Sequence, residues 1–170
     1  MDELELRITK RLDAFGGPAD EVDILVNGVD FLSLVREVER PFAAEEGLPF
    51  LAGSYTGLPP EAVFLPSRRL LGEPDGLYDD EEEKICLLGC GCGVIGCWPL
   101  MARIAVEGET VVWSDFEQPH RADDTLHSSE RRIGVWRYNG FGPFVFEKSR
   151  YVAELGKLRG LFTSSGEPRI

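Results

Sequence analysis

The segment Pro99–Phe116, PLMARIAVEGETVVWSDF, decides the fold class of this chain. Alternate residues from Leu100 to Val106 are apolar, and this period of two is typical of a β-strand with one buried face. A second run, ETVVWSDF, follows the pair Glu107-Gly108, which is a tight-turn signal. Two such runs joined by a short glycine-containing turn predict an antiparallel β-hairpin.

The same reasoning, taken outward from this hairpin, predicts further strands near residues 3–9, 22–26, 84–89 and 144–146. Amphipathic helices are expected near 30–40 and 149–162. The strands are not interleaved with long helices, which disfavours a parallel sheet. The prediction is one two-layer α+β domain over residues 1–162, with a mainly antiparallel sheet of about four to six strands, two helices, and a frayed tail at 163–170.

Capping signals define the expected helix ends. Asp30 is placed to cap the first helix, and Pro41 is expected to lie just beyond its end. Ser149 is the expected cap of the second helix.

Three segments lack a regular pattern. Residues 47–76 are rich in glycine and proline and predict a long loop that contains at most a short strand or one helical turn. The run Asp79–Lys84 is expected to be a solvated surface loop. The polar stretch Gln118–Gly134 has no periodicity and predicts an exposed loop.

The composition limits the classes of partner. The chain of 170 residues carries 30 Asp and Glu against 18 Lys and Arg, a formal net charge of −12. Such a surface repels nucleic acids and anionic membranes, attracts a basic protein partner, and also keeps a protein soluble. The first residues contain neither a signal peptide nor a long apolar run, so we expect a cytoplasmic protein with reduced thiols.

The stretch Cys86–Pro99, CLLGCGCGVIGCWP, contains all four cysteines of the chain and allows three interpretations. The first is a zinc site formed by Cys90, Cys92 and Cys97 and completed by His120, because thiolate and imidazole are good zinc ligands. The spacing differs from familiar zinc motifs, in which two cysteine knuckles are separated by an intervening segment.

The second interpretation is a redox switch formed by neighbouring thiols, but no Lys, Arg or His lies within the loop to lower a thiol pKa. The third is a tight turn whose glycines allow close backbone approach and whose cysteines are buried small residues. The pattern favours this third interpretation.

No catalytic residue and no residue binding an organic cofactor can be assigned. We therefore expect a non-catalytic protein that acts by binding another protein, for example an acidic inhibitor or immunity-type protein that covers a basic partner. The alternative is a zinc- or thiol-dependent enzyme or sensor that uses Cys90, Cys92 and Cys97.

The segment Gly89–Arg121, GCGCGVIGCWPLMARIAVEGETVVWSDFEQPHR, together with the later NGFGPFVFEKSRYVAEL, resembles a family of uncharacterised bacterial, mainly actinobacterial, proteins. The resemblance implies a bacterial cytosolic setting. It implies no activity, ligand or site residue.

Overall fold

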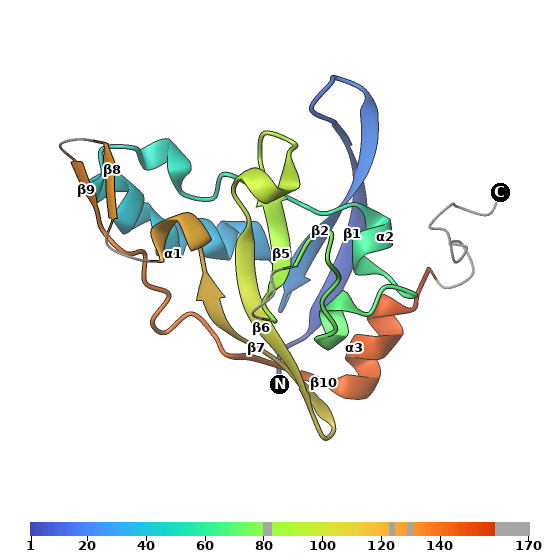
Figure 1. Ribbon diagram of the computed structural model, residues 1–170. Coiled ribbons are helices and arrows are strands. Elements are labelled where there is room, and N and C mark those ends of the chain that lie inside the picture. The colour runs from blue at the N-terminus through green and yellow to red at the C-terminus, as the bar shows by residue number, and fades with distance from the viewer. Residues whose placement is uncertain (80–82, 123–124, 129–130, 159–170) are drawn as a thin grey trace.

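Two antiparallel sheets form the framework of the protein in the computed structural model, which describes residues 1–79, 83–122, 125–128 and 131–158 (Figure 1). The larger sheet has five strands in the order β10-β7-β6-β5-β4, namely Phe144–Glu147, Thr110–Glu117, Leu100–Glu107, Ile85–Cys90 and Tyr55–Thr56. The smaller sheet has the order β1-β2-β3, namely Leu4–Leu12, Pro18–Val26 and Val29–Asp30. The predicted α+β class is confirmed, and the second sheet is a feature that the sequence analysis did not separate from the first.

The predicted hairpin is the centre of the larger sheet. Strands β6 and β7 pair antiparallel, with Ile104 opposite Trp113 and Val106 opposite Val111. Gly108, in the turn between them, has a φ of 58°, a conformation that glycine adopts without steric cost. The local period and the turn residue therefore predicted this element correctly.

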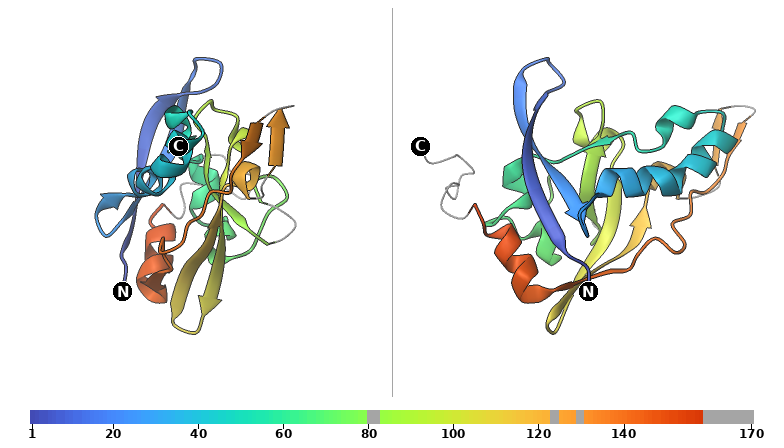
Figure 2. Two further views of the ribbon diagram at one scale, coloured as in Figure 1. Left: turned by 90° about the vertical axis from the view of Figure 1, so that its left-hand side faces the viewer. Right: turned by 180° about the vertical axis from the view of Figure 1, so that it is seen from behind.

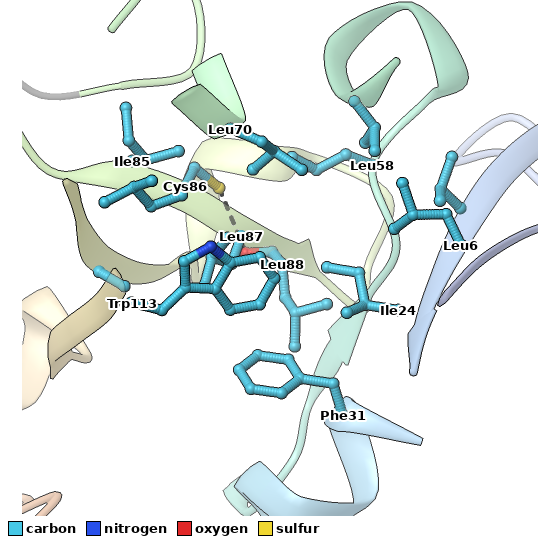
Figure 3. Close-up of a cluster of buried hydrophobic side chains, with 14 of the residues drawn as sticks. Leu6, Ile24, Phe31, Leu58, Leu70, Ile85, Cys86, Leu87, Leu88 and Trp113 are labelled. Carbon is cyan, nitrogen blue, oxygen red and sulfur yellow. Dashed lines mark hydrogen bonds between the residues drawn. The ribbon is translucent and has the colours of Figure 1, made fainter. Parts of the chain in front are cut away.

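The hydrophobic core lies between the two sheets (Figure 3). Its largest side chain is Trp113, which is fully buried and meets Phe31 edge-on at a ring-centroid distance of 5.7 Å. The indole N–H of Trp113 donates to the Tyr151 hydroxyl at 2.9 Å, and this hydroxyl donates to the Leu70 carbonyl at 2.6 Å. The buried indole N–H and the buried phenol hydroxyl are thus both hydrogen-bonded. Buried polar groups need such bonds because they have lost their contacts with water.

Helix α1, Phe31–Glu45, begins where the sequence predicted and ends later. Asp30 caps it, with its carboxylate accepting from the Ser33 N–H at 3.1 Å. The prediction that Pro41 lies beyond the helix was wrong. Pro41 is exposed, so the carbonyl left without its usual partner one turn earlier can be solvated by water.

The C-terminal helix α3, Lys148–Leu155, is shorter than predicted. Its cap is Glu147, whose carboxylate accepts from the backbone N–H groups of Ser149 and Arg150, so the prediction of Ser149 as the cap was wrong. The helix stops at Gly156, which weakens helix propagation. The predicted tail at 163–170 lies outside the described residues.

The segments predicted as loops contain more structure than expected. Residues 47–76 hold β4, helix α2 (Pro60–Val63) and two 3₁₀ turns, and the stretch after Gln118 holds the hairpin β8–β9, Thr125–Ser128 with Arg131–Ile133. Gln118 and Arg121 are buried, so that stretch is not simply an exposed loop. The side chain of Asp79 is buried too, against the prediction of a solvated run, because it pairs with an arginine that lies ten residues earlier in the sequence.

Among the helices that the structure describes, none combines the length and apolar character needed to cross a membrane. The tip of the β1–β2 hairpin lies beside the loop that follows β5, at the top of Figure 1 and again in the view from behind in Figure 2. This juxtaposition positions the candidate site.

Candidate metal centre in the cysteine loop

The loop after β5 is held in place by close backbone contacts at two glycines. The Gly91 N–H donates to the Ser54 carbonyl at 2.9 Å. Gly93 has a φ of 94°, and a Cβ atom there would lie 3.0 Å from Ala14 in the tip of the β1–β2 hairpin. Only glycine combines this backbone conformation with this proximity, so the GCGCG sequence serves to seat the loop against the hairpin.

Three cysteine side chains converge on this loop. The sulfur atoms of Cys90, Cys92 and Cys97 all lie within 4.8 Å of one another. Cys90 ends β5, Cys92 follows the first glycine, and a 3₁₀ turn over Ile95–Cys97 brings the third sulfur back to the other two. One residue separates Cys90 from Cys92, and four residues separate Cys92 from Cys97. This spacing does not match a familiar zinc motif, but it allows the three sulfur atoms to lie close together.

Exposure distinguishes the members of the cluster. Cys90 is buried, whereas Cys92 and Cys97 are exposed. The prediction that the cysteines of this loop are buried small residues was thus wrong for two of them, because the glycine turn lifts the chain out of the sheet after Cys90. The fourth cysteine, Cys86, is buried in β5 and lies outside the group, its thiol directed to the Leu88 carbonyl at 3.3 Å.

The thiols differ in acidity for local reasons. Burial raises the pKa of Cys90 to about 11 and that of Cys86 to about 12. The pKa of Cys92 is lowered, first by the backbone N–H of Val94, which donates to its sulfur at 3.4 Å, and then by its contact with Cys90. Backbone N–H groups thus supply part of the electropositive environment that no side chain of the loop provides.

His120 does not join the three sulfurs. Within the part of the chain that the structure describes, the group of metal-ligating atoms within 4.8 Å consists of the three cysteines alone. The His120 ring instead stacks on Trp98, with ring centroids 5.4 Å apart and an interplanar angle of 6°. The guanidinium of Arg121 also lies over Trp98, at 5.0 Å, which makes this indole part of a stacked cluster beside the loop.

The exposed side of the cluster opens into a cavity of about 450 Å³. Cys92 lines it together with Tyr55, Thr56 and the carboxylates Asp13, Asp20 and Glu21. A metal ion held by the three thiolates would therefore have room for a further ligand on the cavity side.

A buried acid adjoins the site and was missed from the sequence. Glu39 is fully buried, and one of its oxygens accepts hydrogen bonds from the Tyr55 and Tyr138 hydroxyls, both at 2.5 Å. Its other oxygen accepts from the Gly53 N–H at 2.9 Å. Burial raises the pKa of Glu39, and these hydrogen bonds oppose the rise.

A sequence signal for this acid did exist. Phe31, Val35, Glu39 and Ala43 are spaced four residues apart and are all buried, so a carboxylate stood on the apolar face of the predicted helix. Tyr55 is the cross-strand partner of Cys90 in the β4–β5 pair, and its hydroxyl donates to Glu39. Tyr55 therefore links the buried acid to the cysteine cluster.

Comparisons with models of protein families, with curated proteins and with solved structures gave no match. The resemblance to an actinobacterial family consequently stays a prediction, and the arguments that follow depend on the geometry of this chain.

Proposed function

We propose that this protein is a zinc-binding protein whose metal is held by Cys90, Cys92 and Cys97 and takes its fourth ligand from outside the chain. The observation that carries the proposal is the mutual approach of the three sulfur atoms to within 4.8 Å. Thiolates select zinc and other soft metal ions over magnesium and calcium, which prefer oxygen ligands.

The distances suit tetrahedral zinc. Zinc–sulfur bonds of about 2.3 Å in a tetrahedron place neighbouring sulfurs about 3.8 Å apart. The observed upper limit of 4.8 Å exceeds this separation by an amount that small side-chain rotations supply. Metal binding would also displace the proton of Cys90, whose burial disfavours a thiolate without a cation beside it.

The number of protein ligands favours an open site. Structural zinc sites are closed by four protein side chains, whereas catalytic sites keep one position for water or substrate. Here three thiolates face a cavity of about 450 Å³ through Cys92. This arrangement supports a zinc-dependent enzyme or a sensor that binds an exogenous ligand, rather than a purely structural zinc.

The test is elemental analysis of tag-free protein purified without chelator, combined with Co²⁺ titration of the apo-protein. We expect about one zinc per chain and, with cobalt, intense absorption bands typical of tetrahedral thiolate coordination. Cys97→Ser should lower metal affinity by more than the roughly 10–100-fold that removal of a supporting residue costs.

The matched control is Cys86→Ala, which removes a cysteine outside the cluster. It should retain full metal binding, even though loss of a buried thiol costs some stability. A chain without bound metal and with no cobalt–thiolate bands would refute the proposal. Equal loss of metal in both variants would also refute it, since the cluster would then not be the site.

A second candidate is a thiol-based redox sensor, favoured by the exposure of both Cys92 and Cys97 within one sulfur cluster. It predicts metal-free protein in which hydrogen peroxide oxidises these two thiols to a disulfide, each peroxide being reduced to two water molecules. Mass spectrometry of peptides from the oxidised protein separates this outcome from the zinc proposal.

A further inference from the structure

Two of the three clustered thiols are open to a small solute. Cys92 is exposed and lines the cavity of about 450 Å³, and Cys97 is exposed at the end of the 3₁₀ turn Ile95–Cys97. Cys90, at the end of β5, is only 8% exposed. A reagent dissolved in water therefore reaches Cys92 and Cys97 and is kept from Cys90.

The turn between these two cysteines is anchored at one residue and unobstructed at the next. Ile95 packs against the core, and a Cβ atom added at Gly89 of β5 would lie 3.0 Å from the Ile95 side chain. At Gly96, no atom of the described residues beyond its chain neighbours lies within 4 Å of an added Cβ atom. Ile95 thus keeps Cys97 near Cys92, and the space at Gly96 allows the small shift that an S–S bond of about 2.05 Å requires.

A bound zinc ion would prepare these sulfurs for oxidation. A thiol that coordinates zinc gives up its proton, and the thiolate is the form of cysteine that acts as a nucleophile. Two thiolates held close together also supply the two electrons that the reduction of a peroxide consumes. An oxidant that reaches the site can therefore remove ligands from the metal.

We propose that a peroxide releases the zinc ion by oxidising Cys92 and Cys97 to a disulfide. This release rests on the proposed function, because it requires a bound ion, and it adds a regulation to the same site. It differs from a metal-free redox sensor in its output, which is the loss of zinc from the protein.

The oxidation has two steps. The Cys92 sulfur attacks one oxygen of hydrogen peroxide, the O–O bond breaks, and the departing hydroxide takes a proton to become water. The Cys97 sulfur then attacks the sulfur of the resulting sulfenic acid, the S–O bond breaks, and a second hydroxide leaves as water. The two sulfurs lose two electrons, the peroxide gains them, and the zinc ion is neither oxidised nor reduced.

Release of the ion follows from the change in its ligands. Metal ligands of this kind must be thiolates, and a disulfide sulfur carries no charge. The disulfide leaves Cys90 as the last of the three thiolates, and this residue binds a proton in place of the metal. One peroxide and three protons thus yield one disulfide, one thiol, two water molecules and the free ion.

The test is a titration of zinc-loaded protein with hydrogen peroxide, in which the dye 4-(2-pyridylazo)resorcinol reports the released zinc. We expect about one zinc ion for each peroxide consumed, two electrons being transferred per disulfide. Removal of peroxide with catalase and reduction with a phosphine should restore zinc binding, since a disulfide is reversible. A sample without peroxide measures the zinc that the dye removes by itself.

Differential alkylation identifies the oxidised pair. Trypsin cleavage after Lys84 and Arg103 gives one peptide that contains all four cysteines, so the labels are assigned by fragmentation in the mass spectrometer. The disulfide should join Cys92 to Cys97, and the two buried cysteines should stay reduced.

Variants separate the two steps and control for the other cysteine. In metal-free Cys97→Ser, dimedone should trap several times more sulfenic acid at Cys92 than in the wild-type protein, because the thiol that resolves it is gone. Equal trapping in the two proteins would overturn the assigned pair. Zinc-loaded Cys86→Ala should release its ion at the same peroxide concentration as the wild-type protein, since Cys86 lies outside the cluster.

The remaining outcomes distinguish the release from the zinc site itself. Zinc that stays bound at a peroxide concentration that oxidises the metal-free protein would overturn the release and leave the zinc site intact, because the metal would then protect the thiols. A disulfide that includes Cys86 or Cys90 would also overturn it. A chain that takes up no zinc would overturn the proposed function, and the release with it.

Discussion

Arg69 and Asp79 form a buried ion pair in which the guanidinium donates to both carboxylate oxygens, at 2.6 and 2.8 Å. Their side chains are 1% and 0% exposed. Arg69 also donates to the carbonyls of Ala62 and Cys86, and Asp79 accepts from the Cys86 N–H. The pair thereby ties α2 and the segment before β5 to the strand that ends in the cysteine cluster.

Asp79→Asn should lower the free energy of unfolding by about 3 kcal/mol, because it leaves the guanidinium of Arg69 buried without a counter-charge. Urea denaturation monitored by tryptophan fluorescence gives this value. The control is Glu73→Gln, which removes an exposed partner of Arg68 and should cost less than about 1 kcal/mol. Similar losses in the two variants would show that the buried pair has no special role.

Glu39 should make stability depend on pH. Its pKa is raised above the ordinary value of 4.5, so the folded protein keeps this proton to a higher pH than the unfolded chain does. The stabilisation is complete below the ordinary pKa and is lost as the pH rises through the folded-state pKa. Glu39→Gln should therefore flatten the decline of stability from pH 4.5 upward in urea titrations.

The control for that titration is Glu37→Gln on the exposed side of the same helix. It should leave the slope of the wild-type protein unchanged. A slope that is the same in all three proteins would assign the pH dependence to other groups.

The native apo-protein should present two reactive thiols. Cys92 and Cys97 are exposed, whereas Cys86 and Cys90 are buried. Reaction with DTNB should consume two thiols per chain rapidly and all four in guanidinium chloride. Within the fast pair, Cys92 should react first, because its lowered pKa gives a larger thiolate fraction. Slow reaction of all four thiols with DTNB in the native protein would contradict the exposure of Cys92 and Cys97.

Gly57→Ala should destabilise the protein by about 2 kcal/mol through overpacking. A Cβ atom at this position would lie 2.2 Å from the Val22 carbonyl oxygen, next to the hydrogen bond from the Val22 N–H to the Leu58 carbonyl. The control is Gly76→Ala, where nothing lies within 4 Å of the added atom. Equal melting temperatures for the two variants would contradict this prediction, because they would show that the backbone of β2 at Val22 can move away from the added methyl group at little cost.

Local patterns predicted the elements whose determinants are close in the sequence. The β6–β7 hairpin follows from its alternation and its Glu-Gly turn, and the start of α1 follows from Asp30. The helix ends were less accurate, because the cost of Pro41 depends on solvent exposure and the cap at Glu147 competes with Ser149. The solvent exposure of Pro41 and the choice between Glu147 and Ser149 as the cap cannot be read from the residue types alone.

The candidate site was predictable only in part for the same reason. Cys90, Cys92 and Cys97 are neighbours in the sequence, so their convergence needs only a short turn. Whether His120 reaches them depends on Trp98, which holds the imidazole ring by stacking. The burial of Asp79 and the tyrosine partners of Glu39 depend on contacts between distant segments, which no local pattern encodes.

The contact between Gly93 and Ala14 has a thermodynamic consequence. It joins the loop of the proposed zinc site to the tip of the β1–β2 hairpin. If a bound ion restricts the loop, the hairpin is restricted with it, and the free energy of metal binding then includes the conformational entropy that the hairpin loses. Linkage makes the effect reciprocal: a contact that holds the hairpin in place strengthens metal binding by the same factor by which the metal stabilises that contact. One glycine would then couple the metal to a hairpin that supplies none of its three thiolate ligands.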